Sequence, residues 1–164
     1  MSVLKILVLL LVVSFEKPSD ECSKIYLIRH AEKVRTDKSD RDPDLNNKGF
    51  IRAENWKDYF FDKDISKIYS TNYRRTVKTV KPLAESKNLE IIIYSSDDIV
   101  YQDFLNSSVG ENTVVVGHSN TIPDFVNNLI NEDHYDQIDD LTNSNLYIVS
   151  VCNSSITHKL ITVD

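Results

Sequence analysis

The sequence has no surplus of basic residues, no internal repeat and no low-complexity tract. Its 25 acidic residues outnumber its 19 lysines and arginines, which gives a formal net charge of -6 and a sequence pI of about 5.2. This balance argues against a nucleic acid or an anionic membrane surface as a partner, because both require a basic face. With 164 residues, of which 41% are hydrophobic, the chain has the size of one globular domain with a substantial core.

The sequence also lacks an apolar run long enough to span a bilayer comfortably. The run at residues 6–13 follows Lys5 and is too short for a transmembrane helix, but it resembles the apolar core of a targeting segment. A polar linker comes next. We therefore expect a signal segment and linker over residues 1–20 and one folded domain over residues 22–164, exported to the periplasm or secreted. The alternative is that the apolar run forms the first strand of the fold.

Cysteine is scarce, with Cys22 and Cys152 as the two residues in the chain. They do not have the CxxC spacing of zinc ligands. In an exported protein an even pair suggests a disulfide, and both would lie at the same sheet edge if the strand ending at Cys152 runs antiparallel to the first strand. The alternative is two unpaired thiols.

Hydrophobic periodicity predicts that strands and helices alternate. The expected strands span residues 24–29, 67–70, 89–94, 113–117, 145–152 and 156–163. The first expected helix begins near residue 47. Three further helices are expected over about residues 73–86, 98–106 and 121–131. This order predicts an α/β fold, a three-layer α/β/α sandwich with a mostly parallel sheet and an antiparallel edge.

Reactive side chains follow three of the expected strands. The first strand ends in Arg29 and His30, the second leads through a short loop to Arg75, and the fourth ends next to His118. Because parallel strands end at one edge of a sheet, we expect these four side chains to meet in one pocket.

Two histidines could hold a metal ion, but the permanent charges of Arg29 and Arg75 would repel it. A phosphate ester fits better, because arginine bonds two oxygens at once and phosphoryl transfer spreads charge over three oxygens. A neutral imidazole is also a competent nucleophile for phosphorus. We therefore predict that His30 forms a covalent intermediate and that His118 donates to the transferring group. The alternative is two ordinary polar histidines at strand ends.

Four short motifs lie in order along the chain. They are RHAEK at 29–33, LNNKGFIRA at 45–53, YSTNYRRTVKT at 69–79 and GHSN at 117–120. This set resembles the motifs of the histidine phosphatase superfamily, which has the phosphoglycerate mutase-like fold. The match runs from about Lys24 to the last strand, and with the signal segment it resembles a short extracytoplasmic type.

The resemblance implies a metal-independent phosphatase with a phosphohistidine intermediate on His30 and no metal or organic cofactor. Arg29, Arg75 and His118 would complete the phosphate pocket. Asn120, in the last motif, is a candidate substrate contact.

The chain departs from the family pattern at the leaving-group acid. Many members carry a glutamate in an inserted segment as the proton donor, and no clear counterpart is present here. Asp98 is the candidate acid, with Asp97 as its neighbour, although either carboxylate could instead cap the next helix. Glu32 lies too close to His30 for a role to be assigned, and a loop ion pair is the simplest reading.

The sequence thus predicts an exported phosphomonoesterase for small or peptide-borne phosphate monoesters, with no nucleic-acid partner and no membrane span in the mature chain. The alternatives are a phosphohistidine or phosphoprotein phosphatase, a mutase-type phosphotransferase and a noncatalytic phosphate-binding module. His134 is expected to be a surface residue, and His158 a structural residue of the last hairpin.

Overall fold

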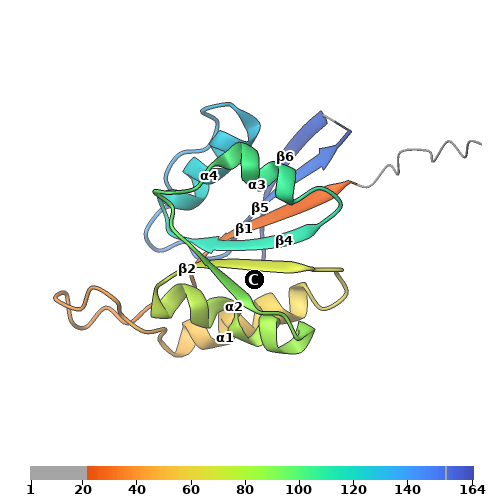
Figure 1. Cartoon of the computed structure of the whole chain (residues 1–164). Helices are drawn as coiled ribbons and strands as arrows, with labels where there is room; N and C mark the ends of the chain where they lie inside the picture. The colour runs from red at the N-terminus through yellow and green to blue at the C-terminus, as the bar shows by residue number, and fades with distance from the viewer. Residues whose placement is uncertain (1–21, 154) are drawn as a thin grey trace, which may run out of the picture.

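The structure, a computed structural model, describes residues 22–153 and 155–164, which form a six-stranded sheet covered by helices on both faces (Figure 1). The expected signal segment lies outside the described residues. In chain order the elements are β1 (Ser23–Arg29), α1 (Asn47–Tyr59), β2 (Lys67–Thr71), α2 (Arg74–Lys87), β3 (Ile91–Tyr94), α3 (Tyr101–Ser107), β4 (Asn112–Gly117), α4 (Thr121–Ile130), β5 (Asn145–Cys152) and β6 (Ser155–Thr162).

The strands lie in the order β3-β2-β4-β1-β5-β6. The pairs among β1 to β4 are parallel, whereas β5 and β6 add an antiparallel edge. The predicted fold class, an α/β sandwich with a mostly parallel sheet, is confirmed. Within the described residues, we find no helix with both the length and the apolar character of a membrane span.

The central parallel strands end at one level of the sheet. Arg29 of β1 pairs with Gly117 of β4, and Ser70 of β2 pairs with Val116 of β4. The loops that follow these strands therefore leave the sheet side by side, as expected for parallel strands.

Two cores hold the layers together, one on each face of the sheet. On one face, Trp56 of α1 and Leu83 of α2 pack with Ile28 of the sheet. On the other face, Phe104 of α3 and Phe125 of α4 pack over neighbouring strand residues, with ring centroids 5.1 Å apart. Each of these buried side chains contributes about 2–3 kcal/mol through removal of apolar area from water. The sheet is thus rigid where its strand ends carry polar groups.

The start of α1 fixes the loop that follows β1. Asn46 caps the helix by accepting a hydrogen bond from Gly49 N at 3.0 Å. A Cβ at Gly49 would lie 2.1 Å from Glu32 O, so only glycine allows this approach. The Glu32 carboxylate accepts two hydrogen bonds from Arg52 Nε and a third from its Nη2, at 2.9–3.0 Å. Glu32 therefore forms the ion pair expected of it.

A disulfide joins the start of β1 to the end of β5. β5 runs antiparallel to β1, with Ser23 opposite Val151. Cys22 and Cys152, one residue further out on each strand, are bonded with a Cα to Cα distance of 4.4 Å. The expected bridge is thus present, at the end of β1 away from His30.

Candidate active site

His30 lies directly after β1 and is 3% exposed. Its backbone N donates to Gly117 O at 2.9 Å, and its backbone O accepts from Asn143 Nδ2 at 2.8 Å. Its ring Nδ1 lies 2.7 Å from Ala31 O. Because a carbonyl oxygen only accepts, Nδ1 carries the ring proton and Nε2 keeps a free lone pair. The backbone thus fixes the orientation and the tautomer of this imidazole and leaves Nε2 without a proton.

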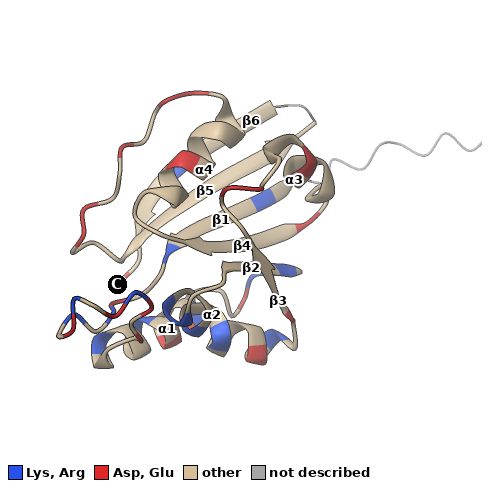
Figure 2. Cartoon of the chain, turned by 60° about the vertical axis from the view of Figure 1, so that its left-hand side comes forward, with Lys and Arg blue, Asp and Glu red and all other residues tan. Residues whose placement is uncertain are grey.

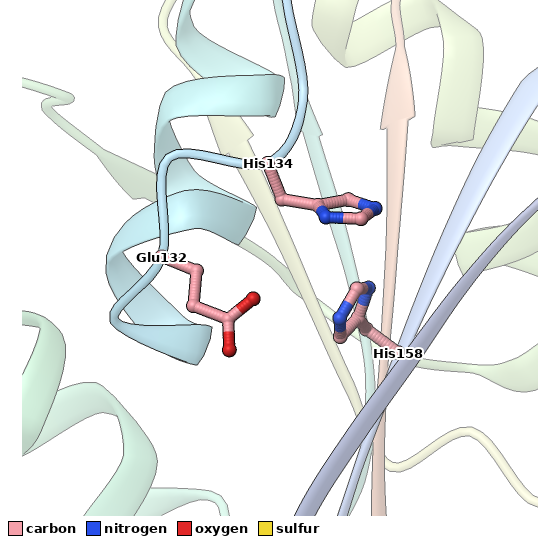
Figure 3. Close-up of side chains that lie close together, drawn as sticks. All are labelled: Glu132, His134 and His158. Carbon is pink, nitrogen blue, oxygen red and sulfur yellow. The ribbon is translucent and has the colours of Figure 1, made fainter.

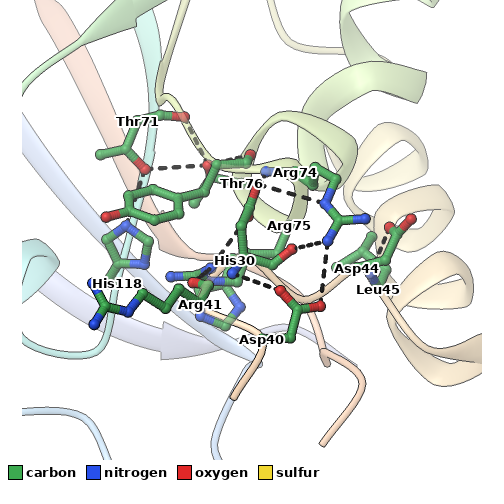
Figure 4. A network of polar contacts seen from close by, with 12 residues as sticks. His30, Asp40, Arg41, Asp44, Leu45, Thr71, Arg74, Arg75, Thr76 and His118 are labelled. Carbon is green, nitrogen blue, oxygen red and sulfur yellow. Dashed lines mark hydrogen bonds and ion pairs between the residues drawn. The ribbon is translucent and has the colours of Figure 1, made fainter. Parts of the chain in front are cut away.

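His118 follows β4 and lies against His30, with ring centroids 5.5 Å apart and an angle of 64° between the planes. Its Nε2 is 3.1 Å from Thr71 Oγ1, at the end of β2, and its ring meets that of Tyr73 edge to face at 4.9 Å. Thr71 Oγ1 in turn lies 3.1 Å from Thr76 Oγ1 in α2 (Figure 4). The ends of two strands and the start of a helix together fix the second imidazole.

Arg29, the last residue of β1, is 2% exposed. Its Nη1 donates to Asp139 O at 2.8 Å and to Thr142 O at 3.0 Å, and its Nη2 pairs with Asp140 Oδ1 at 2.7 Å. These partners belong to the segment between α4 and β5. The guanidinium is therefore clamped by a loop more than a hundred residues away in the sequence.

Arg75, in the first turn of α2, is held less tightly. Its guanidinium carbon lies 4.3 Å from the centre of the Tyr73 ring, a cation–π contact. Its Nη1 lies 3.4 Å from Asp42 Oδ1 and 3.5 Å from Arg41 O, near the outer limit of hydrogen bonding. Figure 4 shows Arg75 beside His30 and His118. This guanidinium can form better hydrogen bonds to an incoming anion.

Two buried donors in this site have no acceptor. Neither Arg29 Nε nor Arg75 Nε has a hydrogen-bond partner among the described residues. A buried unpaired donor of this kind costs about 1–3 kcal/mol, or more for a charged group. Oxygen atoms of an anion between the two guanidinium groups would remove this cost.

The same environment keeps both imidazoles neutral. Burial, followed by the charges of Arg29 and Arg75, lowers the pKa of His30 to about 3, against the opposing effect of the bond to Ala31 O. Burial and then the charges of Arg75 and Arg29 lower the pKa of His118 to about 4. Both rings are thus uncharged at neutral pH, and the site's positive charge comes from the arginines.

A hollow of about 540 Å³ is lined by Thr71, Tyr73, Arg75, His118 and Asn120 among others, whereas Arg29 and His30 lie outside its lining. Asn120 is the N-cap residue of α4, but its side chain makes no capping bond and so is available to a ligand. A larger hollow of about 810 Å³ runs along α2 and β3, away from both active-site histidines, and is lined in large part by aliphatic side chains. We place the candidate site beside the smaller hollow because its lining includes Arg75 and His118, and the His118 ring lies against that of His30.

The two candidate acids, Asp97 and Asp98, border different hollows. Asp97 borders the hollow that contains His118, whereas Asp98 borders a neighbouring one with Val100 and Phe104. The expectation that Asp98 supplies the proton stays a prediction, and its neighbour Asp97 is the candidate that borders the hollow with His118. The alternative, that one of them caps the next helix, is wrong, because the N-cap residue of α3 is Val100.

Acidic residues border the cationic site, and one of them, Asp42, reaches Arg75 at 3.4 Å. Acidic and basic residues alternate along the loop between β1 and α1, as the colours of the ribbon show (Figure 2). Asp42 and Asp40 of this loop pair with Arg74, and Asp44 pairs with Lys78. Arg74 is thus occupied by the loop, while its neighbour Arg75 contributes to the site.

Sequence reasoning missed the residues that support the site. Thr71 and Tyr73 lie inside the recognised motif at 69–79, and their position beside Arg75 was the available signal. Asn143 and Asp140 had no such signal, because they reach β1 from a segment without periodicity.

One family model matches part of the chain, and several solved structures share its fold. A sequence profile of the histidine phosphatase superfamily (branch 1) matches residues 25–96, which include the first three motifs. The comparison with curated protein sequences found no match.

Solved structures show the same fold over most of the chain. SixA from Agrobacterium tumefaciens is 20% identical, with a TM-score of 0.62 over 85% of this chain and 98% of that one. The protein histidine phosphatase SixA complexed with tungstate is 15% identical, with a TM-score of 0.66 over 85% of this chain and 96% of that one. A phosphoglycerate mutase from Bacillus anthracis is 12% identical, with a TM-score of 0.65 over 87% and 93% of the two chains. At these identities the likeness establishes the fold.

Proposed function

We propose that this chain is a phosphatase of the histidine phosphatase superfamily that hydrolyses phosphate monoesters through a phosphohistidine on His30. One observation carries the proposal. A buried neutral imidazole, with its free Nε2 fixed by the bond from Nδ1 to Ala31 O, lies among two arginines and a second imidazole. A nucleophile, an anion pocket and a neutral donor are what transfer of a phosphoryl group requires.

The first step forms a bond between His30 Nε2 and phosphorus as the ester P–O bond breaks. The Nη and Nε donors of Arg75, with the charge of Arg29, stabilise the negative charge on the phosphoryl oxygens. The leaving alkoxide takes a proton, for which Asp97, at the border of the hollow, is the proposed donor. The products of this step are the alcohol and the phosphorylated imidazole.

Water completes the reaction. It attacks phosphorus, the N–P bond breaks, inorganic phosphate leaves, and the proton released by the water returns to the carboxylate that gave one up. His30 is then neutral again, with its Nδ1 proton still donated to Ala31 O. No step needs a metal ion or an organic cofactor.

A second function is a phosphohistidine phosphatase acting on proteins. Its support is the fold shared with the two SixA structures, one of which is described as a protein histidine phosphatase and holds tungstate, a tetrahedral oxyanion. We place phosphomonoesters first because the disulfide between Cys22 and Cys152 and the apolar run at residues 6–13 support an exported protein. A mutase-type transfer and a noncatalytic phosphate-binding role rank below both.

The test compares His30→Gln, Arg75→Gln and the matched control Arg74→Gln on an aryl phosphate. We expect His30→Gln to lower kcat by at least about 1000-fold and Arg75→Gln by about 100- to 1000-fold. Arg74→Gln should stay within about 3-fold of wild type, because Arg74 pairs with the acidic loop and not with the site. Substantial turnover by His30→Gln would refute the assignment of the nucleophile.

Rapid quenching distinguishes catalysis from binding alone. A substrate labelled in its phosphoryl group should leave acid-labile label on wild-type protein and none on His30→Gln. A panel of aryl phosphates, phosphopeptides and phosphohistidine peptides, compared by kcat/KM, then separates the two candidate functions.

A further inference from the structure

Three potential metal ligands meet on the side of the molecule near β6. Glu132 and His134 lie in the segment that follows α4, and His158 lies on β6. One ligand atom from each side chain lies within 4.8 Å of the other two, and the side chains converge on one space (Figure 3). The two ring centroids are 4.7 Å apart.

From this cluster we propose that Glu132, His134 and His158 bind one divalent ion of the zinc class. Two imidazole nitrogens and one carboxylate oxygen are a donor set that Zn²⁺ takes up in proteins, with the remaining position left to water. Such a site is separate from the phosphate pocket and is independent of the proposed function.

The distances are compatible with zinc after a small movement of side chains. Tetrahedral ligands at about 2.0–2.1 Å from the ion lie about 3.3 Å from each other. The ligand atoms, now within 4.8 Å, must therefore approach by about 1.5 Å at most. Glu132 and His134 are exposed, so rotation of their side chains can supply this movement without disturbing the core.

The surroundings already orient two of the ligands. Tyr135 Oη lies 2.8 Å from His158 Nδ1, which leaves Nε2 of that ring for the ion while Nδ1–H donates to the hydroxyl. Asn127 of α4 holds the segment in place. Its Oδ1 accepts from the backbone N of His134 at 3.2 Å and of Tyr135 at 2.9 Å, and its Nδ2 donates to Tyr135 O at 2.9 Å.

The local charge favours a cation. Residues 131–139 contain four carboxylates and no lysine or arginine, and the next carboxylate, Asp140, is paired with Arg29 and Arg35. Lys159 follows His158, but adjacent residues of a strand point to opposite faces, so its ammonium group lies away from the cluster. This is the reverse of the phosphate pocket, where two arginines exclude a cation.

The bound ion would fasten an irregular segment to an edge strand. The segment from Asn131 onward has no regular structure until β5, and it carries the carbonyls of Asp139 and Thr142 that hold Arg29. A metal tie between this segment and β6 would reduce its freedom in the folded state. Its expected effect is on stability, and the phosphatase rate should not depend on it.

Binding is tested by titrating Zn²⁺ into the full chain, free of any affinity tag and stripped of metal with a chelator. We expect one ion per chain by calorimetry, and Co²⁺ in its place should give visible absorption bands. His134→Gln and His158→Gln should each weaken zinc binding by more than about 100-fold, and Tyr135→Phe by about 10-fold, as for the loss of an outer hydrogen bond to a ligating histidine.

Two controls distinguish zinc binding at this cluster from a general effect of negative charge and from binding at the active site. Asp136→Asn removes the same charge as Glu132→Gln but no proposed ligand, so it should bind zinc within about 3-fold of wild type while Glu132→Gln does not. His118→Gln tests the active-site pair and should also retain binding. Circular dichroism with excess chelator should show that every variant is folded.

Saturating zinc should raise the Tm of wild type and of Asp136→Asn, and leave that of His158→Gln unchanged. The proposal is overturned if zinc binds more weakly than about 10⁻⁴ M, or if His134→Gln and His158→Gln keep wild-type affinity. It is equally overturned if His118→Gln alone abolishes binding, which would place the ion at the active site.

Discussion

The neutral state of His30 predicts a specific loss of stability in acid. The pKa of the ring is lowered by burial to about 3 in the folded protein, against an ordinary value of 6.5 for an unfolded chain. The unfolded state therefore binds more protons than the folded state between these values, and the free energy of unfolding decreases as the pH falls from about 6.5 toward about 3. Above about pH 6.5 the contribution of His30 is complete.

The size of this effect follows from the two pKa values. Near pH 5, protonation favours the unfolded state about 30-fold through this one ring, which corresponds to about 2 kcal/mol relative to pH 8. The assay is urea unfolding of wild type and His30→Gln at pH 8 and pH 5, with the disulfide intact. The variant should lose about 2 kcal/mol less than wild type between the two pH values.

Asn120→Ala is the matched control, because it changes the hollow beside His118 without removing a titrating group. It should keep the full pH dependence of wild type. An equal loss in wild type and His30→Gln would show that burial does not hold this imidazole neutral, and the argument for a free nucleophile at Nε2 would fail with it.

Three further variants test the fold around the site by urea unfolding. Gly49→Ala should lower the free energy of unfolding by about 1–3 kcal/mol, although alanine has the better helix propensity, because the new Cβ would lie 2.1 Å from Glu32 O. Unchanged stability would contradict this close approach. Replacing both Cys22 and Cys152 by serine should lower the free energy of unfolding by up to about 5 kcal/mol, because the bridge spans 130 positions. A loss well under about 1 kcal/mol would show that the bridge hardly constrains the unfolded chain. Arg52→Met should cost about 1–3 kcal/mol by leaving the carboxylate of Glu32 without its main partner, and no loss would mean that water replaces it fully.

Much of the fold could be predicted because its signals are local. A continuous apolar run identifies a parallel strand buried on both faces, as in β1 and β4, and side chains at the ends of such strands must meet. The disulfide was predictable for a related reason, since it required only that β5 run antiparallel to β1. The edge strand β3 was predicted from residue 89 but begins at Ile91, where pairing with β2 begins.

The parts that could not be predicted depend on contacts between distant segments. Nothing in the local pattern around Asp98 indicates that it lines a different hollow from its neighbour Asp97. The segment 131–144 has no periodicity, so neither its bonds to Arg29 nor the meeting of His134 with His158 had a signal in the sequence. Tertiary packing alone places these groups.

The two arginines of the site are held so differently that they cannot have the same role. Arg29 has strong bonds from both Nη atoms to fixed acceptors, so its charge stays in place whether or not an anion is bound. Arg75 has only long contacts with Arg41 and Asp42, and its ring contact with Tyr73 leaves the edge of its guanidinium open. An anion therefore has little to displace at Arg75, and this residue can supply the two parallel hydrogen bonds that a phosphoryl group takes from an arginine. In the reaction that we propose, Arg29 would therefore fix the electrostatic field of the site, while Arg75 would be the side chain that adjusts as phosphorus moves from the leaving oxygen to His30.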